Sequence, residues 1–211
     1  MRSDFLNIDC MQYMKGLEDD YFDIALADPP YGLNLANNPF RGKFEKSSWD
    51  LMIPSDDFFM ELMRVSRNQI IWGGNYFSLP PTKGFVIWDK KQGETFSSAM
   101  CEYAWTSFDV PAKIFRFDAR KRGENIHPTQ KPIALYAWLL KNYAKEGDLV
   151  FDPMAGSGNS RIAAYQMGFD YVGCEINPTY YYDAVEHYNQ LCRGIYRDKR
   201  GREVVQGDLF S

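Results

Sequence analysis

Cysteine is scarce in this sequence, and long apolar runs are absent. The 211 residues include four cysteines, at positions 10, 101, 174 and 192, and no Cys-x-x-Cys pair. This spacing disfavours both a disulfide framework and a zinc site, and it is typical of a reduced intracellular protein. No apolar segment is long enough for a signal peptide or a membrane span. We therefore expect a soluble cytoplasmic protein that binds no metal and no membrane.

An excess of positive charge is also lacking. Lys and Arg total 24 against 28 Asp and Glu, which gives a formal net charge of -4. The chain as a whole therefore does not attract nucleic acid electrostatically. Basic residues do gather locally, and each group is either a solvated face or a site of phosphate contact. The groups are Arg41, Lys43 and Lys46; Lys113, Arg116, Arg120, Lys121 and Arg122; and Arg193, Arg197, Lys199, Arg200 and Arg202.

Apolar residues make up 45% of the chain and aromatic residues 16%, which is enough for one globular domain spanning residues 1–211. Segments with helical spacing alternate with short apolar runs. This alternation predicts a doubly wound α/β sheet. The runs expected to form strands are residues 22–28, 69–72, 84–88, 102–106, 149–152 and 171–175, with residues 204–205 closing the set; residues 5–8 alternate weakly and offer a further short strand.

The sequence Asp28-Pro29-Pro30-Tyr31 directly follows one of these runs. Two consecutive prolines cannot donate to a sheet ladder or enter a helix, so the strand must end at Asp28. In α/β sheets the carboxyl edge is where ligands bind. The Asp28 carboxylate and a proline carbonyl can accept both hydrogens of an exocyclic amine, and Tyr31 can stack on a base. These residues predict a site for an amino-bearing nucleobase, although the same residue types also dominate ordinary turns.

A second strand-to-helix junction, at residues 152–160, is rich in glycine. Gly156 and Gly158 let the backbone bend sharply and approach a ligand closely. Glu175 ends the next strand, where an acid can bind both ribose hydroxyls. A phosphate-binding loop would need a lysine that is absent, and a dinucleotide site would need a third glycine where Arg161 stands. What remains is a nucleoside cofactor without a pyrophosphate; S-adenosylmethionine fits, with Asp152 available to its cationic amine.

Three segments together resemble the signature motifs of amino-group DNA methyltransferases. They are Asp28 to Tyr31, the stretch His127-Pro128-Thr129-Gln130-Lys131-Pro132, and residues 152–160. Their order resembles the circularly permuted β group of that family, and residues 72–77 and 88–90 are similar to compact phage-type members. The likeness implies a single-domain, Rossmann-like class I methyltransferase with a doubly wound, mostly parallel seven-stranded sheet. It also implies that the protein is located in the cytoplasm of a bacterial or phage-infected cell.

The resemblance further implies a set of site residues. The target base is expected to be held by Asp28, Pro29, Pro30 and Tyr31. Lys131 is expected to line the methionine end of the cofactor, and either Asp9 or Asp208 to meet its adenine. The implied cofactor-binding residues are Asp9, Cys10, Asp28, Lys131, Asp152, Pro153, Met154, Ala155, Gly156, Ser157, Gly158, Asn159, Glu175 and Ile176.

DNA is the substrate that the resemblance implies. Residues 32–50 show no periodicity and are expected to form a mobile loop, either a lid over the site or an inert excursion. Residues 107–127 form a short basic recognition or linker segment. Relatives usually carry a longer region there, so this chain either reads few bases or borrows recognition from a homodimer or a partner subunit. The expected nucleic-acid contacts are Tyr31, Arg41, Lys43, Lys113, Arg116, Arg120, Lys121 and Arg122.

The expected reaction is direct transfer of a methyl group from S-adenosylmethionine to the exocyclic N6 of adenine in flipped-out DNA. An Asp at position 28 is typical of adenine enzymes, whereas a Ser there is typical of cytosine-N4 enzymes. A cytosine-C5 enzyme would need a nucleophilic cysteine, usually after a proline, and none of the four cysteines follows one. An N4-cytosine enzyme, an RNA adenine methyltransferase and an inactive DNA-binding subunit remain as alternatives.

Overall fold

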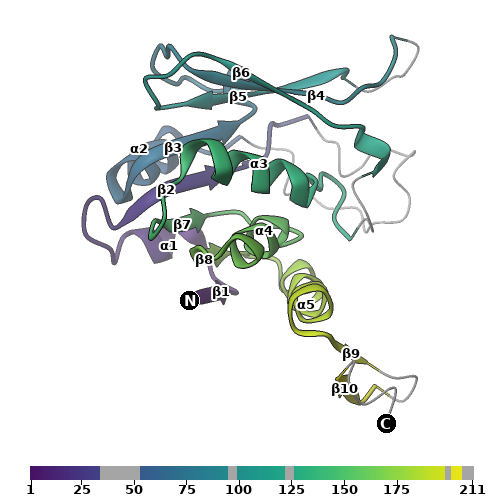
Figure 1. Cartoon of the computed structure of the whole chain (residues 1–211). Coiled ribbons are helices and arrows are strands. Elements are labelled where there is room, and N and C mark those ends of the chain that lie inside the picture. Colours follow the sequence, from purple (N-terminus) through teal and green to yellow (C-terminus); the bar gives the residue numbers. More distant parts are fainter. Residues whose placement is uncertain (34–52, 95–98, 122–125, 198–200, 206–211) are drawn as a thin grey trace.

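The computed structural model describes residues 1–33, 53–94, 99–121, 126–197 and 201–205 (Figure 1). Its main feature is a large sheet of eight strands, and a separate small sheet has two strands. The large sheet runs in the order β1 (Ser3–Leu6), β8 (Asp170–Cys174), β7 (Leu149–Asp152), β2 (Phe22–Ala27), β3 (Ser66–Trp72), β5 (Cys101–Thr106), β4 (Phe85–Asp89) and β6 (Lys113–Arg116). The small sheet pairs β9 (Ile195–Arg197) with β10 (Glu203–Val205).

The large sheet contains one reversed strand. β5 pairs antiparallel with both β3 and β4, and every other pairing in the sheet is parallel. The predicted mostly parallel α/β sheet is therefore confirmed, but it has eight strands rather than seven. The eighth strand, β6, lies within residues 107–127, where the basic side chains concealed a strand that buries Phe115.

Residues 204–205 do not close the large sheet as predicted. They belong to β10, which pairs with β9 through the register Val204 to Tyr196 and Val205 to Ile195. The chain first passes through a π-helical turn, η5 (Asn189–Arg193), which follows the last long helix. Figure 1 shows the resulting hairpin beyond that helix and away from the large sheet. Residues 204–205 do form a strand, as predicted, but the chain reaches them beyond α5 and η5, away from the large sheet.

Helices cover both faces of the large sheet. Helices α3 (Ile133–Tyr143), α4 (Asn159–Met167) and α5 (Pro178–Tyr188) pack on one face, and α1 (Cys10–Met14) and α2 (Asp56–Val65) pack on the other. Along β2, Ile24 and Leu26 join the first core while Ala25 and Ala27 join the second. Burial on both faces explains why these strands read as continuous apolar runs rather than as alternating patterns. Two 3₁₀ turns, η3 (Gly74–Tyr76) and η4 (Ala119–Lys121), complete the described elements.

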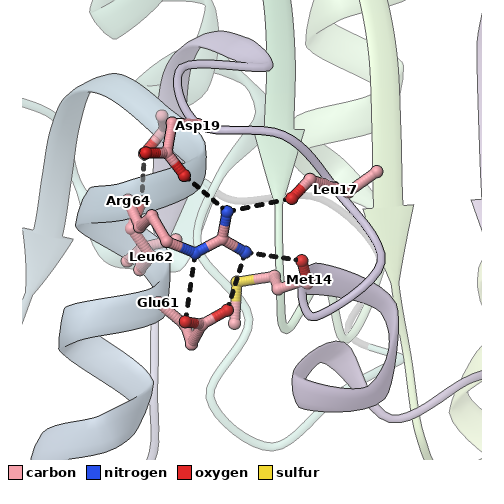
Figure 2. Close-up of polar contacts among 7 residues, drawn as sticks. Met14, Leu17, Asp19, Glu61, Leu62 and Arg64 are labelled. Carbon is pink, nitrogen blue, oxygen red and sulfur yellow. Dashed lines mark hydrogen bonds and ion pairs between the residues drawn. The ribbon is translucent and has the colours of Figure 1, made fainter.

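Arg64, in the last turn of α2, ties this helix to the segment after α1 (Figure 2). Its guanidinium donates to the carbonyl of Met14 at 3.0 Å and to that of Leu17 at 2.9 Å. It also pairs with the carboxylates of Asp19 and Glu61, so its planar fork is fully used. Helix ends leave carbonyls without partners, and Arg64 supplies a donor to one of them. The C-terminal end of α1 is thereby fixed to α2.

Four parallel strands bring their carboxyl ends to one edge of the sheet. β1, β8, β7 and β2 are neighbours in that order, and all of their mutual pairings are parallel. The residues that follow them, at positions 7–9, 175–177, 153–158 and 28–31, therefore meet at this edge.

Within the described residues, no helix combines the length and apolar character needed to cross a bilayer.

Candidate active site

A cavity of about 350 Å³ opens at this carboxyl edge. Residues from all four strand ends contribute to its wall, together with the start of α2 and the segment before α3. Its volume lies within the roughly 300–1,000 Å³ of small-molecule sites. The sequence-predicted residues that line it are Asp9, Cys10, Asp28, Pro30, Lys131, Pro153, Met154, Ala155, Gly156, Ser157, Glu175 and Ile176.

The glycine turn after β7 forms one wall. Gly156 and Gly158 both have positive φ, +51° and +69°, a conformation that side chains with a Cβ rarely adopt. A Cβ on Gly156 would lie 3.3 Å from the His127 ring, and one on Gly158 would lie 3.2 Å from the Ala184 methyl group. The turn therefore packs tightly against both the segment before α3 and helix α5. Glycine is required here by geometry as well as by proximity to a ligand.

Glu175 is held by backbone N–H groups at the cavity wall. Its carboxylate accepts hydrogen bonds from the N–H of Gly156 at 2.9 Å and from the N–H of Asn177 at 2.7 Å. Burial raises the pKa of Glu175, while these hydrogen bonds oppose the rise. Each carboxylate oxygen retains a further acceptor position, so the group can also bind hydroxyls of a ligand.

Asp152 lies beneath the turn rather than at the cavity. Its carboxylate accepts a hydrogen bond from the Met154 N–H at 3.1 Å and one from the Ser160 hydroxyl at 2.5 Å. Ser160 also contacts the Tyr171 hydroxyl at 3.0 Å. Burial raises the pKa of Asp152 to about 7 despite these hydrogen bonds. Asp152 thus holds the loop in shape from below, and the cavity-facing position expected for it is taken by the turn itself.

Asn159 and Asp9 also have clear structural roles. The Asn159 side-chain amide donates to the Lys131 carbonyl at 2.7 Å, which ties the start of α4 to the segment before α3. Asp9 caps α1 by accepting the Met11 N–H at 2.7 Å, and it faces the cavity as well. Its rival Asp208 lies outside the described residues.

Asp28 also lines the cavity and begins a chain of buried ion pairs. The Lys131 ammonium lies 2.5 Å from Asp28 Oδ1 and 3.1 Å from Glu102 Oε2. Glu102 in turn pairs with Lys90 at 2.6 Å. We call Asp28, Lys131, Glu102 and Lys90 the ion-pair chain. Its side chains are between 2% and 22% exposed, so their charges interact with little screening.

Asp28, Lys131 and Glu102 shift one another's pKa values. Burial raises the pKa of Asp28, with Lys131 opposing the rise and Glu102 adding to it. Burial alone would lower the pKa of Lys131, but the carboxylates of Asp28 and Glu102 raise it. Burial alone would raise the pKa of Glu102, yet Lys131 and Lys90 lower it to about 2. Lys131 therefore remains an ammonium shared by two carboxylates.

Tyr31 completes the surroundings of Asp28. Its hydroxyl donates to Asp28 Oδ1 at 2.6 Å, and burial together with the Asp28 charge raises the pKa of Tyr31 well above its ordinary value. Its ring stacks on Tyr76, with centroids 5.2 Å apart and planes at 16°. A Cβ on Gly73 would lie only 2.3 Å from this ring. Gly73, which directly follows β3, thus makes the space that Tyr31 occupies.

Several wall residues were not predicted from the sequence. Ile8, Phe58, Tyr136 and Tyr180 line the cavity, and Tyr180 contacts the His127 ring edge-to-face at 4.4 Å between centroids. They resemble ordinary core positions in the sequence, because burial in a wall and burial in a core require the same side chains. Glu102 was also missed, since its strand reads as a plain apolar run.

The basic residues predicted to contact nucleic acid are largely engaged within the chain. Lys113 donates to the Asn142 side chain at 2.8 Å, and Arg116 lies 3.7 Å from Asp89. Arg120 pairs with Asp118 at 2.7 Å, and its hydrogen bonds lower the pKa of Asp118 to about 2. Lys121 is exposed at the end of η4. Arg41, Lys43, Arg122 and the loop predicted at residues 32–50 lie largely or wholly outside the described residues.

Within the described part of the chain, no group of three or more His, Cys, Asp or Glu side chains is arranged to hold a metal ion. The cavity wall carries three carboxylates, those of Asp9, Asp28 and Glu175.

Comparison with known proteins gives this arrangement a family. The family model described as DNA methylase, for the N6/N4 methyltransferases, matches residues 71–186, more than half of the chain. The Type II methyltransferase M2.MboI of Moraxella bovis is 25% identical over 221 residues, which cover 79% of this chain and 80% of that protein.

Two solved structures share the fold. The M1.HpyAVI–SAM complex has a TM-score of 0.62 and 16% identity, with 87% of this chain and 98% of that chain covered. The cytosine-N4-specific PvuII DNA methyltransferase has a TM-score of 0.59 and 12% identity, with 90% and 92% covered. The fold, the paired motifs at one sheet edge and the family match agree: the chain belongs to the N6/N4 amino-group DNA methyltransferases, enzymes that use S-adenosylmethionine as methyl donor.

Proposed function

We propose that this protein transfers a methyl group from S-adenosylmethionine to the exocyclic N6 of adenine in DNA. The observation that carries the proposal is a single cavity lined both by Asp28 and Pro30 and by the glycine turn with Glu175. The first pair suits an amino-bearing base, and the second set suits a nucleoside cofactor. A shared cavity brings the two reactants together, which is the main requirement for direct transfer.

The cavity wall fits the cofactor chemically. Glu175 has acceptor capacity for ribose hydroxyls, and apolar side chains such as Ile8, Phe58 and Tyr180 offer surfaces for an adenine ring. Asp9 adds a carboxylate near the same end. When bound, S-adenosylmethionine supplies an electrophilic methyl group on a sulfonium sulfur. The residues around it need only bind, orient and exclude water, because no covalent enzyme intermediate is required.

Asp28 is the residue that acts on the base. Within the described residues, both donors that meet its carboxylate, Lys131 Nζ and the Tyr31 hydroxyl, do so at Oδ1. This leaves Oδ2 to accept a hydrogen from the amino group of the base. The Pro29 carbonyl is the second acceptor in our proposal. Two such hydrogen bonds direct the nitrogen lone pair away from the ring system, and the proton can leave afterwards to Asp28 or water.

The proposal is tested by incubating the protein with S-adenosylmethionine and unmethylated duplex DNA, digesting the DNA and separating the nucleosides by liquid chromatography with mass detection. We expect N6-methyladenine from the wild type and none from Asp28→Ala. N4-methylcytosine alone would overturn the adenine assignment, and its possibility is kept open by the shared fold with an N4-cytosine enzyme. RNA of the same sequence, assayed in parallel, distinguishes an RNA enzyme.

A further inference from the structure

The ion-pair chain contains a residue that none of the sequence motifs includes. Glu102 stands on β5, the reversed strand, directly opposite Trp88 of β4. The reversal places the Glu102 carboxylate against two ammonium groups, those of Lys131 and Lys90. Lys90 directly follows β4, and Lys131 directly precedes Pro132 at the start of α3. Three separate segments thus converge behind Asp28.

Lys131 is almost completely buried. Its side chain is 2% exposed, and its ammonium lies over the rings of Tyr31 and Trp72 at 5.6 and 5.2 Å from their centroids. A buried ammonium needs counter-charge, and Asp28 alone would supply it by a tight one-to-one pair. Such a pair would leave Asp28 a weak hydrogen-bond acceptor, because most of its charge would be neutralised. Because Glu102 also pairs with the Lys131 ammonium, less of the negative charge on Asp28 is neutralised.

We propose that Glu102 is a positioning residue for methyl transfer: by sharing the Lys131 ammonium, it keeps the Asp28 carboxylate oriented and strongly accepting toward the amino group of the base. This inference rests on the proposed function. Glu102 does not line the cavity, so it acts through Lys131 and not by touching the substrate or the cofactor. Lys90 weakens this effect of Glu102, because it competes with Lys131 for the same carboxylate.

Electrostatics predicts that neutralising Glu102 and neutralising Lys90 shift the pKa of Asp28 in opposite directions. The titratable groups around Asp28 are Lys131, Tyr31, Glu102, Tyr136 and Asp152. Among them Glu102 raises the pKa of Asp28, whereas Lys131 lowers it. Glu102→Gln therefore lets Asp28 titrate at lower pH. Lys90→Gln frees Glu102 to pair with Lys131 more fully, so Asp28 titrates at higher pH.

The test combines two measurements on the full chain. The Asp28 carboxyl is titrated by ¹³C NMR without cofactor or DNA, and single-turnover methyl transfer is measured as a function of pH. For Glu102→Gln we expect a downward shift of the titration and a rate lower by about 10²-fold, the size of effect that small misplacements produce. Calorimetry should show cofactor affinity close to that of the wild type. Glu102→Asp should restore part of the rate.

Glu61→Gln is the matched control, because it also removes a glutamate from an ion pair, with Arg64, at a position that does not line the cavity. It should leave the Asp28 titration and the rate unchanged. Unshifted titration in both Glu102→Gln and Lys90→Gln, or a loss of rate equal in Glu61→Gln, overturns the inference. If the wild type methylates no DNA, the proposed function fails, while the NMR titration still decides whether Glu102 controls Asp28.

Discussion

Two parts of the cavity wall are organised in different ways; we call the glycine turn with Glu175 the proposed cofactor end and the surroundings of Asp28 the proposed base end. At the cofactor end, the turn after β7 is ordered by its own backbone: positive φ at two glycines and N–H groups donated to Glu175. At the base end, Asp28 is ordered by charged side chains from β5 and from the segment before α3. One end is therefore built locally and the other by distant parts of the chain. The comparison teaches that the first depends mainly on backbone geometry and the second mainly on neighbouring charges.

The largest expected effect falls on the base end. Asp28→Asn keeps the shape of the side chain but removes the charge that Lys131 and the amino group share. We expect the single-turnover rate to fall by about 10³-fold, within the 10²–10⁴-fold range of a positioned proton acceptor. Cofactor affinity, measured by calorimetry, should change little. A variant that loses cofactor binding to the same degree as activity would show that the two ends are not separable.

A smaller effect is expected at the cofactor end. Gly156→Ala places a Cβ 3.3 Å from the His127 ring and strains a residue with φ +51°. Left-handed backbone costs about 1–2 kcal/mol for a residue with a Cβ, which corresponds to about 5- to 30-fold weaker cofactor binding.

Gly168→Ala is the control for this variant. Gly168 has a similar φ of +80°, but a Cβ there would meet nothing within 4 Å. We expect it to lower the melting temperature without changing cofactor affinity. Equal loss of affinity in both variants would mean that general strain, and not the turn at the cavity, is responsible.

The pH dependence of stability should also separate the two ends. Asp152, under the cofactor turn, has a pKa raised to about 7 by burial, against about 3.9 in an unfolded chain. The folded state therefore holds its proton more tightly, and this contribution to stability is complete below pH 4 and is lost as pH rises to about 7.

Asp152→Asn removes this titration. Its melting temperature relative to the wild type should rise between pH 4 and pH 7, with each unit of pKa difference corresponding to about 1.36 kcal/mol. Thermal denaturation across this range measures it. A constant difference between the two proteins would contradict the assignment of a raised pKa to Asp152.

The smallest effect on the site is expected from Arg64. Arg64→Lys keeps the charge but loses the fork that joins the carbonyls after α1 to Glu61 and Asp19 (Figure 2). We expect a lower melting temperature with nearly unchanged activity at 25 °C. Arg67→Lys, which disturbs one exposed pair with Asp23, should lower it less. Equal shifts would show that the network adds nothing beyond surface charge.

Local sequence predicted where the two strand-end motifs lie. The proline pair after β2 and the glycines after β7 indicate where strands end. Proline restricts the backbone angles and glycine permits unusual ones, whatever their surroundings. Parallel strands then bring both ends to one edge. The same reasoning failed for Asp152, whose side chain turns under the loop to Ser160, since only packing decides which way a carboxylate faces.

The sequence by itself determined the two strand-end motifs and the alternation of strands and helices, since backbone angles and apolar periodicity are properties of short segments. Only the tertiary structure decided the eighth strand, the reversal of β5 and the meeting of Glu102 with Lys131 and Asp28. These features depend on which strands become neighbours. That choice is made by burial over the whole sheet, so no short segment encodes it.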